Sequence, residues 1–155
     1  MSINSLLEYG RWIGAGVGIF WANYLGGSPQ EQFSIITAWT VLSIAGLTGM
    51  ESLVFSESAS KVSGYGTGGA YQRQSGLNNL ALALACIVSY ALGWGTMAQA
   101  ALMSVLLIFL ILSAANHFYS AFKEGNRNRR NLLRPLLTAM LVGVIVPYMM
   151  AALAA

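Results

Sequence analysis

Long apolar stretches alternate with short polar segments along the chain, which is the pattern of a protein that crosses a membrane several times. A helix needs about 20 predominantly apolar residues to span the hydrocarbon core of a bilayer. Four segments meet this requirement: residues 33–55, 77–94, 97–119 and 135–154. Pro135 suits the first turn of the last of these helices, where a missing backbone donor does no harm. The pattern predicts an all-α fold, a polytopic membrane helix bundle.

The N-terminal region predicts a further membrane helix over about residues 5–25, although Glu8 and Arg11 precede its short apolar core. Small residues recur there at every fourth position, namely Gly10, Gly14, Gly18, Ala22 and Gly26. Such a strip of small side chains lets another backbone approach one helical face closely. We therefore expect this face to pack against another helix, and we expect residues 1–155 to form a single membrane domain.

Composition supports the same class of protein and excludes several chemistries. Only 8% of the residues are charged and 56% are hydrophobic, whereas a soluble domain carries roughly 25% charged residues. The single cysteine, Cys86, excludes an intrachain disulfide and any metal site built from several cysteines. The single histidine, His117, excludes haem held by two histidines of the chain and a zinc site built from several histidines. We expect no metal, and the sequence identifies no cofactor.

Five of the eight basic residues cluster in the segment 120–134, which indicates orientation in a membrane rather than nucleic-acid binding. They are Lys123, Arg127, Arg129, Arg130 and Arg134. Because basic loops stay on the cytoplasmic side, we expect the 120–134 loop inside and the C-terminus outside, in a prokaryotic inner membrane. The short turn Gly93-Trp94-Gly95 then lies outside, and the 56–74 loop lies inside.

Polar residues within or beside the predicted spans fall at one depth, near the cytoplasmic end. Placing polar residues inside a membrane costs free energy, so their presence indicates a functional site or a packed bundle interior. The predicted site comprises Glu51, Arg73, Asn78, Asn79, Asn116, His117 and Arg134. We expect Glu51 to pair with Arg73 or Arg134, and we expect no comparable cluster at the outer end. Two interpretations stay open: a packed hydrogen-bond network, or a pocket that also holds a ligand.

Two motif matches in the 56–74 loop lack their required context. Gly64 to Gly69 fits the spacing G-x-G-x-x-G, which binds a dinucleotide only after a strand and before a helix. Ser58 to Lys61 fits S-x-x-K, but the partner motifs of the serine acylases are absent. We interpret both matches as coincidental.

Three short motifs carry a resemblance to a known family: Tyr71-Gln72, the helix start Gly76-Leu77-Asn78-Asn79-Leu80, and Ala114-Ala115-Asn116-His117. Over residues 35–150 the chain resembles a family of small four-helix prokaryotic membrane proteins of uncharacterised function. The resemblance leaves the N-terminal helix outside, and Glu51 stands where the family has a histidine. Arg73 stands where it has an acidic residue. A weaker likeness is to the four-helix glutathione-using membrane enzymes, whose arginine-rich signature is missing here.

These observations support three hypotheses of function. The leading one is a non-catalytic membrane protein whose cytoplasm-side polar pocket binds a membrane lipid, a quinone or another small amphiphile. The second is an accessory subunit of a larger membrane complex or a homo-oligomer, docked through the glycine strip. The third is a glutathione-using enzyme in which Arg73 or Arg134 holds the substrate anion.

Overall fold

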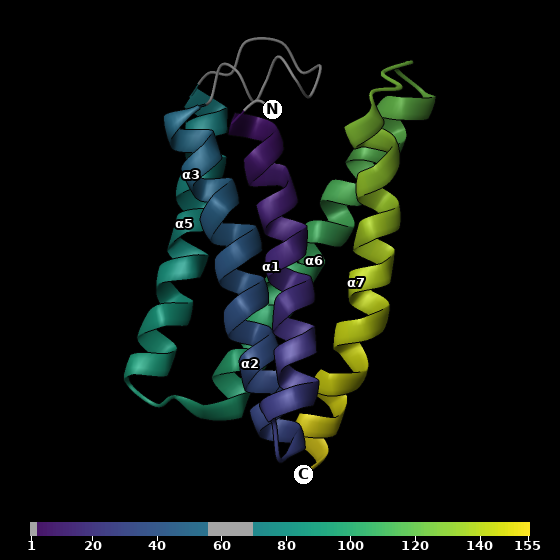
Figure 1. Cartoon of the computed structure of the whole chain (residues 1–155). Coiled ribbons are helices and arrows are strands. Elements are labelled where there is room, and N and C mark those ends of the chain that lie inside the picture. Colours follow the sequence, from purple (N-terminus) through teal and green to yellow (C-terminus); the bar gives the residue numbers. More distant parts are fainter. Residues whose placement is uncertain (1–2, 56–69) are drawn as a thin grey trace.

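The structure is a computed structural model that describes residues 3–55 and 70–155. The two coincidental motif matches, at residues 64–69 and 58–61, lie outside the described residues. Within them the chain is all-α, and consecutive helices run up and down beside one another, so that the two termini lie at opposite ends of the bundle (Figure 1). We call the end that carries the start of the first helix the charged end, and the other the opposite end.

The first helical hairpin joins α1 (Ile3–Leu25) to a long second helix that has three parts. These parts are α2 (Pro29–Val41), the π-helical turn η1 (Leu42–Gly46) and α3 (Leu47–Val54). The helix begins before residue 33 because Ser28 caps it: the Ser28 hydroxyl accepts the Glu31 backbone N–H at 3.2 Å, and the Glu31 carboxylate accepts the Gly27 N–H at 2.8 Å. This arrangement is a variant of the capping box, in which the Glu31 carboxylate binds the N–H of the residue before the cap instead of the N–H of the cap itself.

The second hairpin joins α5 (Ala70–Ala91) to α6 (Gly95–Phe122), and α7 (Arg129–Ala154) completes the chain. Gly93 and Gly95 have φ values of 64° and 80°, a conformation that glycine adopts without strain. The turn therefore falls at the predicted Gly93-Trp94-Gly95 segment.

The expectation that the last helix starts at Pro135 is wrong, because α7 begins at Arg129 and contains Pro135 in its interior. The helix starts earlier because the Asn128 carbonyl accepts the backbone N–H groups of Asn131 and Leu132 at 2.9 and 3.3 Å. Proline removes only one helical hydrogen bond at this point. The α6–α7 connection is consequently shorter than the predicted 120–134 loop.

The small residues of α1 pack against the second helix of the same chain. A Cβ atom added at Gly14 would lie 2.4 Å from the Ser43 Cβ, and one at Gly18 would lie 2.3 Å from the Trp39 Cβ. Gly10 faces Leu47 in the same way, and Ala22 is completely buried. The strip therefore packs against another helix, as expected, and that helix belongs to the same chain.

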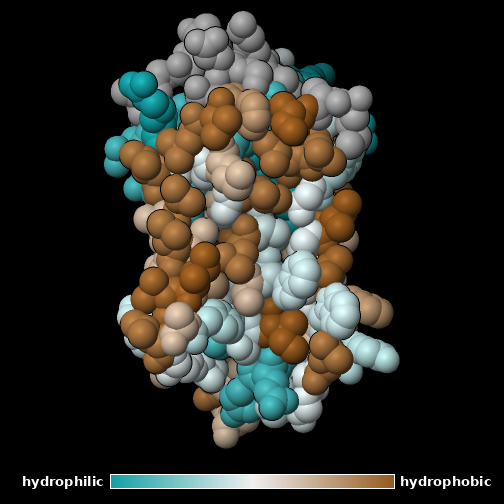
Figure 2. Space-filling view, turned by 60° about the vertical axis from the view of Figure 1, so that its left-hand side comes forward, coloured by the Kyte–Doolittle hydropathy of each residue, from teal (hydrophilic) through white to brown (hydrophobic). Residues whose placement is uncertain are grey.

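Three helices of the described residues are long and apolar enough to cross a membrane: Pro29–Val54, Gly95–Phe122 and Asn131–Ala154. These helices indicate an integral membrane protein. On the face shown in Figure 2, hydrophobic side chains extend along the height of the bundle, and the most hydrophilic ones gather toward its two ends.

Candidate functional site

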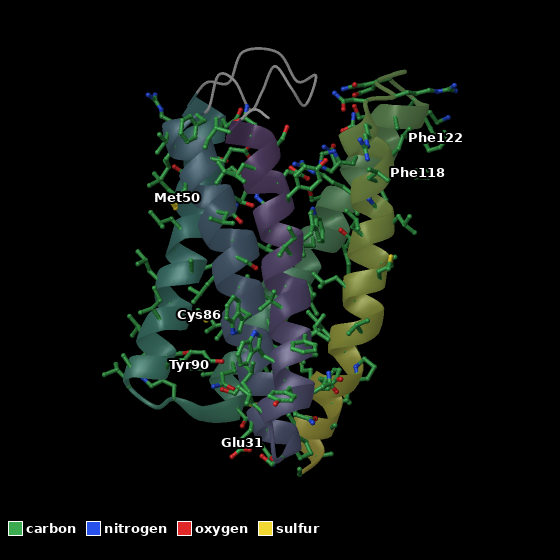
Figure 3. The ribbon with its side chains drawn as sticks, viewed as in Figure 1. Glu31, Met50, Cys86, Tyr90, Phe118 and Phe122 are labelled. Carbon is green, nitrogen blue, oxygen red and sulfur yellow. The ribbon has the colours of Figure 1, made fainter. Side chains whose placement is uncertain are left out.

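A connected set of polar side chains lies at the charged end and joins four helices. We call it the charged cluster: Glu8 and Arg11 of α1, Glu51 of α3, His117 of α6, and Asn131 and Arg134 of α7. Met50 and Phe118, the chain neighbours of Glu51 and His117, both lie in the upper half of the bundle in Figure 3, far from Glu31 at the opposite end.

Arg11 holds the two carboxylates of the cluster together. Its NH2 group contacts the Glu51 Oε2 atom, and its NH1 group lies 3.2 Å from the Glu8 Oε2 atom. The side chains of Arg11 and Glu51 are each only 6% exposed. Among the described residues, the Glu51 Oε1 atom and the Arg11 Nε atom, both fully buried, have no hydrogen-bond partner. This pair therefore keeps one unused acceptor and one unused donor.

Arg134 connects Glu8 to His117 and thereby links α1 to the last two helices. Its Nε and NH2 groups donate to the Glu8 carboxylate at 3.3 and 2.8 Å, and its NH1 group lies 3.0 Å from the His117 Nε2 atom. A guanidinium only donates, so Nε2 must be the unprotonated acceptor nitrogen of the ring. His117 is therefore the neutral tautomer with its proton on Nδ1.

Asn131 completes the orientation of the imidazole. The His117 Nδ1–H group donates a hydrogen bond to the Asn131 Oδ1 atom, at 2.8 Å. The Asn131 side-chain amide in turn donates to the Asn126 backbone carbonyl at 2.8 Å. This contact ties the ring to the α6–α7 connection. A histidine fixed at both nitrogens in this way holds a single orientation.

The charges of the cluster balance. Two carboxylates face two guanidinium groups, and the imidazole between them is neutral, so the net charge is zero. Ionised groups at this burial are tolerated only when they are paired. The balance also means that neither sign of charge is left in excess for a ligand.

The structure brings together only some of the predicted site residues. Glu51, His117 and Arg134 belong to the cluster, whereas Arg73, Asn78 and Asn116 are exposed outside it. Asn79 is buried, but its amide donates to the Ser75 carbonyl of its own helix at 2.9 Å. The expected direct pairing of Glu51 with Arg73 or Arg134 is wrong, because Arg11 of α1 takes that place and Arg134 binds Glu8.

Sequence reasoning missed Glu8, Arg11 and Asn131 as members of the site. The spacing of Glu8 and Arg11, three residues apart on one helical face, was a usable signal. Two opposite charges at the start of an apolar helix cost free energy in a membrane unless they form ion pairs inside a bundle. Asn131 gave no such signal, because it lies in a run of basic residues.

An apolar groove runs along the second helix. We call it the α2 groove; it has a volume of about 360 Å³ and is lined by Ala38, Trp39, Leu42, Ser43 and Leu47. The π-helical turn, Leu42–Gly46, lies in the middle of this stretch. Single π-helical turns inside α-helices are frequent at functional sites.

A smaller polar group lies at the opposite end. The Tyr90 hydroxyl donates to the Ser34 backbone carbonyl and lies 3.2 Å from the Ser34 hydroxyl. The Gln99 amide donates to the same hydroxyl at 3.1 Å. All three residues are uncharged, and they join α2 to the α5–α6 hairpin. The region described contains no group of three His, Cys, Asp or Glu side chains arranged to hold a metal ion.

The fold and the charged cluster define a small all-α membrane bundle with a buried, charge-balanced site at one end. The chain belongs to a family of unknown function, DUF6790, which it matches over residues 6–155. The match includes the N-terminal helix, which the sequence resemblance had left outside. No curated protein and no solved structure gives a significant match.

Proposed function

We propose that this protein is a non-catalytic membrane bundle that binds a small amphiphile, such as a lipid or a quinone, with the polar group of that ligand at the charged cluster. The observation that carries this proposal is the unused hydrogen-bonding capacity of the buried Glu51–Arg11 pair. A buried carboxylate oxygen without a donor is costly. A bound polar group would satisfy it.

We further propose that all five helices span the membrane with the charged end in the cytoplasm. At a rise of ~1.5 Å per residue, α1 and α5, of 23 and 22 residues, reach about as far as the three candidate spans. Among the described charged residues, only Glu31 lies at the opposite end, whereas Arg73, Lys123, Arg127 and Arg129 surround the charged end. This asymmetry agrees with the positive-inside rule, which supports an inner-membrane orientation with the C-terminus outside.

The geometry gives less support to the two other functions. An accessory subunit docked through the glycine strip needs a free strip, and this one contacts Ser43 and Trp39 of the same chain. A glutathione-using enzyme needs a cation for the substrate anion. Arg134 already holds the Glu8 carboxylate, and Arg73 is exposed away from the cluster.

Native mass spectrometry of the protein released from a mild detergent tests the proposal. We expect the wild type to retain an amphiphile-sized adduct and Glu51→Gln to lose it, because the amide cannot offer the same acceptor beside Arg11. Glu124→Gln is the matched control, since Glu124 is exposed in the α6–α7 connection. A wild type without any adduct, or equal occupancy in all three proteins, would refute the proposal.

A further inference from the structure

The α2 groove ends one helical turn from the charged cluster. Ser43, Leu47 and Glu51 follow one another at intervals of four residues, so they lie on one face of the second helix. Leu47 also lies beneath Gly10, the chain neighbour of Arg11, with its Cδ1 atom 3.2 Å from the position of an added Cβ. Leu47, which lines the groove, is therefore one helical turn from Glu51 and packs beside the chain neighbour of Arg11.

The polar end of this path favours an uncharged ligand. Both guanidinium groups of the charged cluster already face carboxylates, so a phosphate or carboxylate headgroup would find no uncompensated positive charge within the cluster itself. An ammonium group would likewise find no uncompensated carboxylate. Within the Glu51–Arg11 pair, the described residues leave one acceptor unused, the Glu51 Oε1 atom, and one donor, the Arg11 Nε–H group. Of two adjacent hydroxyl groups, one can donate to the first while the other accepts from the second.

We propose that the α2 groove and the Glu51–Arg11 pair together form a binding site for a monoacylglycerol. This inference rests on the proposed function and names its ligand class. The groove, at about 360 Å³, lies near the lower end of the ~300–1,000 Å³ range of ligand pockets, which suits one hydrocarbon chain rather than two. Adjacent glycerol hydroxyls supply one donor and one acceptor side by side, whereas the two hydroxyls of a quinol lie across a ring.

The depth of the pair agrees with this ligand. Glu51 lies three residues before Val54, where α3 ends, and this distance corresponds to about 4.5 Å along the helix axis at ~1.5 Å per residue. The hydroxyls would therefore lie just inside the membrane surface. The acyl chain would follow the second helix from Leu47 to Ala38, a distance of about 14 Å by the same rise.

Titration of the full-length protein with monoolein, read by native mass spectrometry, tests the site. Ala38→Phe fills the groove without touching the cluster, and we expect it to weaken monoolein binding about tenfold or more, because overfilling a packed site costs more than a kilocalorie per mole. Ala139→Phe, at an exposed position of α7, is the matched control and should bind as the wild type does. Protection of the buried Cys86 thiol checks that each variant is folded; if Ala38→Phe is not, Leu42→Trp fills the same groove.

Three comparison ligands separate the possible outcomes. Oleic acid, dioleoylphosphatidylglycerol and a short-chain quinol should each bind at least tenfold more weakly than monoolein. Equal or tighter binding of any of them would overturn the assignment to a monoacylglycerol. If Glu51→Gln abolishes the retained adduct while Ala38→Phe leaves monoolein binding unchanged, the groove is refuted and the proposed function stands. If the wild type binds none of the four probes and carries no adduct, both fail.

Discussion

The contact between α1 and the second helix gives the sharpest test of the fold. We predict that Gly14→Ala destabilises the protein, whereas Gly16→Ala, two residues away on the same helix, does not. A Cβ at Gly14 would lie 2.4 Å from the Ser43 Cβ and 2.9 Å from its Oγ, but a Cβ at Gly16 would meet nothing within 4 Å. The Ser43 Cβ is attached to the backbone, so it cannot move aside and the two helices must separate.

The expected magnitude follows from two opposing effects. Overpacking costs about 1–3 kcal/mol, and replacement of glycine by alanine inside a helix contributes about 0.5–1 kcal/mol of stability. Gly14→Ala should therefore lose about 1–2 kcal/mol, and Gly16→Ala should gain a few tenths to 1 kcal/mol. For a chain of this size, a difference of about 2 kcal/mol between the variants corresponds to about 4–8 °C in Tm.

The protein contains its own reporter for this measurement. Cys86 is the single cysteine and is fully buried, so a thiol-reactive fluorophore reports unfolding as temperature rises. The double variant Gly14→Ala/Ser43→Gly adds a methyl group to α1 and removes the hydroxymethyl group that it would meet on the second helix, so it should recover most of the lost stability. A Tm for Gly14→Ala equal to that of Gly16→Ala, or a double variant no more stable than Gly14→Ala, would refute the close approach of these helices.

Two further predictions concern the charged end. In a double-mutant cycle, Glu8→Gln and Arg134→Gln should each cost about 1–2 kcal/mol, because each leaves a partly buried charge with fewer partners. The double variant should cost about 1 kcal/mol less than their sum. Additive losses in thermal unfolding would show that the pair is not coupled. In intact bacterial cells, an impermeant maleimide should label Trp94→Cys but reach Lys123→Cys only after permeabilisation, because the proposed orientation places the charged end in the cytoplasm. The reverse labelling pattern would overturn that orientation.

Local signals in the sequence predicted the local structure well. The apolar runs gave the helices, and the glycines around Trp94 gave the hairpin turn, because a turn with φ values of 64° and 80° needs residues without a Cβ. The bounds were less accurate. Ser28 and Glu31 contained a capping-box signal that places the start of α2 before residue 33, and Pro135 indicated a helix start that the Asn128 carbonyl instead places six residues earlier.

The sequence predicted the end of the bundle at which the candidate site lies, but not which of its charged side chains form ion pairs with one another. Glu51, His117 and Arg134 meet at one end of the bundle, as the spans and their order implied. The partner of Glu51 was missed because a carboxylate can pair with any cation at its depth, and the choice depends on which helix lies beside α3. Arg11 is that partner because the glycines of α1 let this helix pack closely against the second one.

Hydrophobicity alone fixed the membrane class, the helical composition and the end of the bundle that gathers the charges, since these depend only on the order of apolar and polar residues along the chain. The tertiary structure decided which charged side chains form ion pairs and which nitrogen of His117 accepts a hydrogen bond. It also decided that the glycine strip packs against a helix of the same chain and that a groove forms beside the π-helical turn. Those features depend on the rotation of each helix about its axis, and that rotation is set by the packing of neighbouring helices rather than by any one segment.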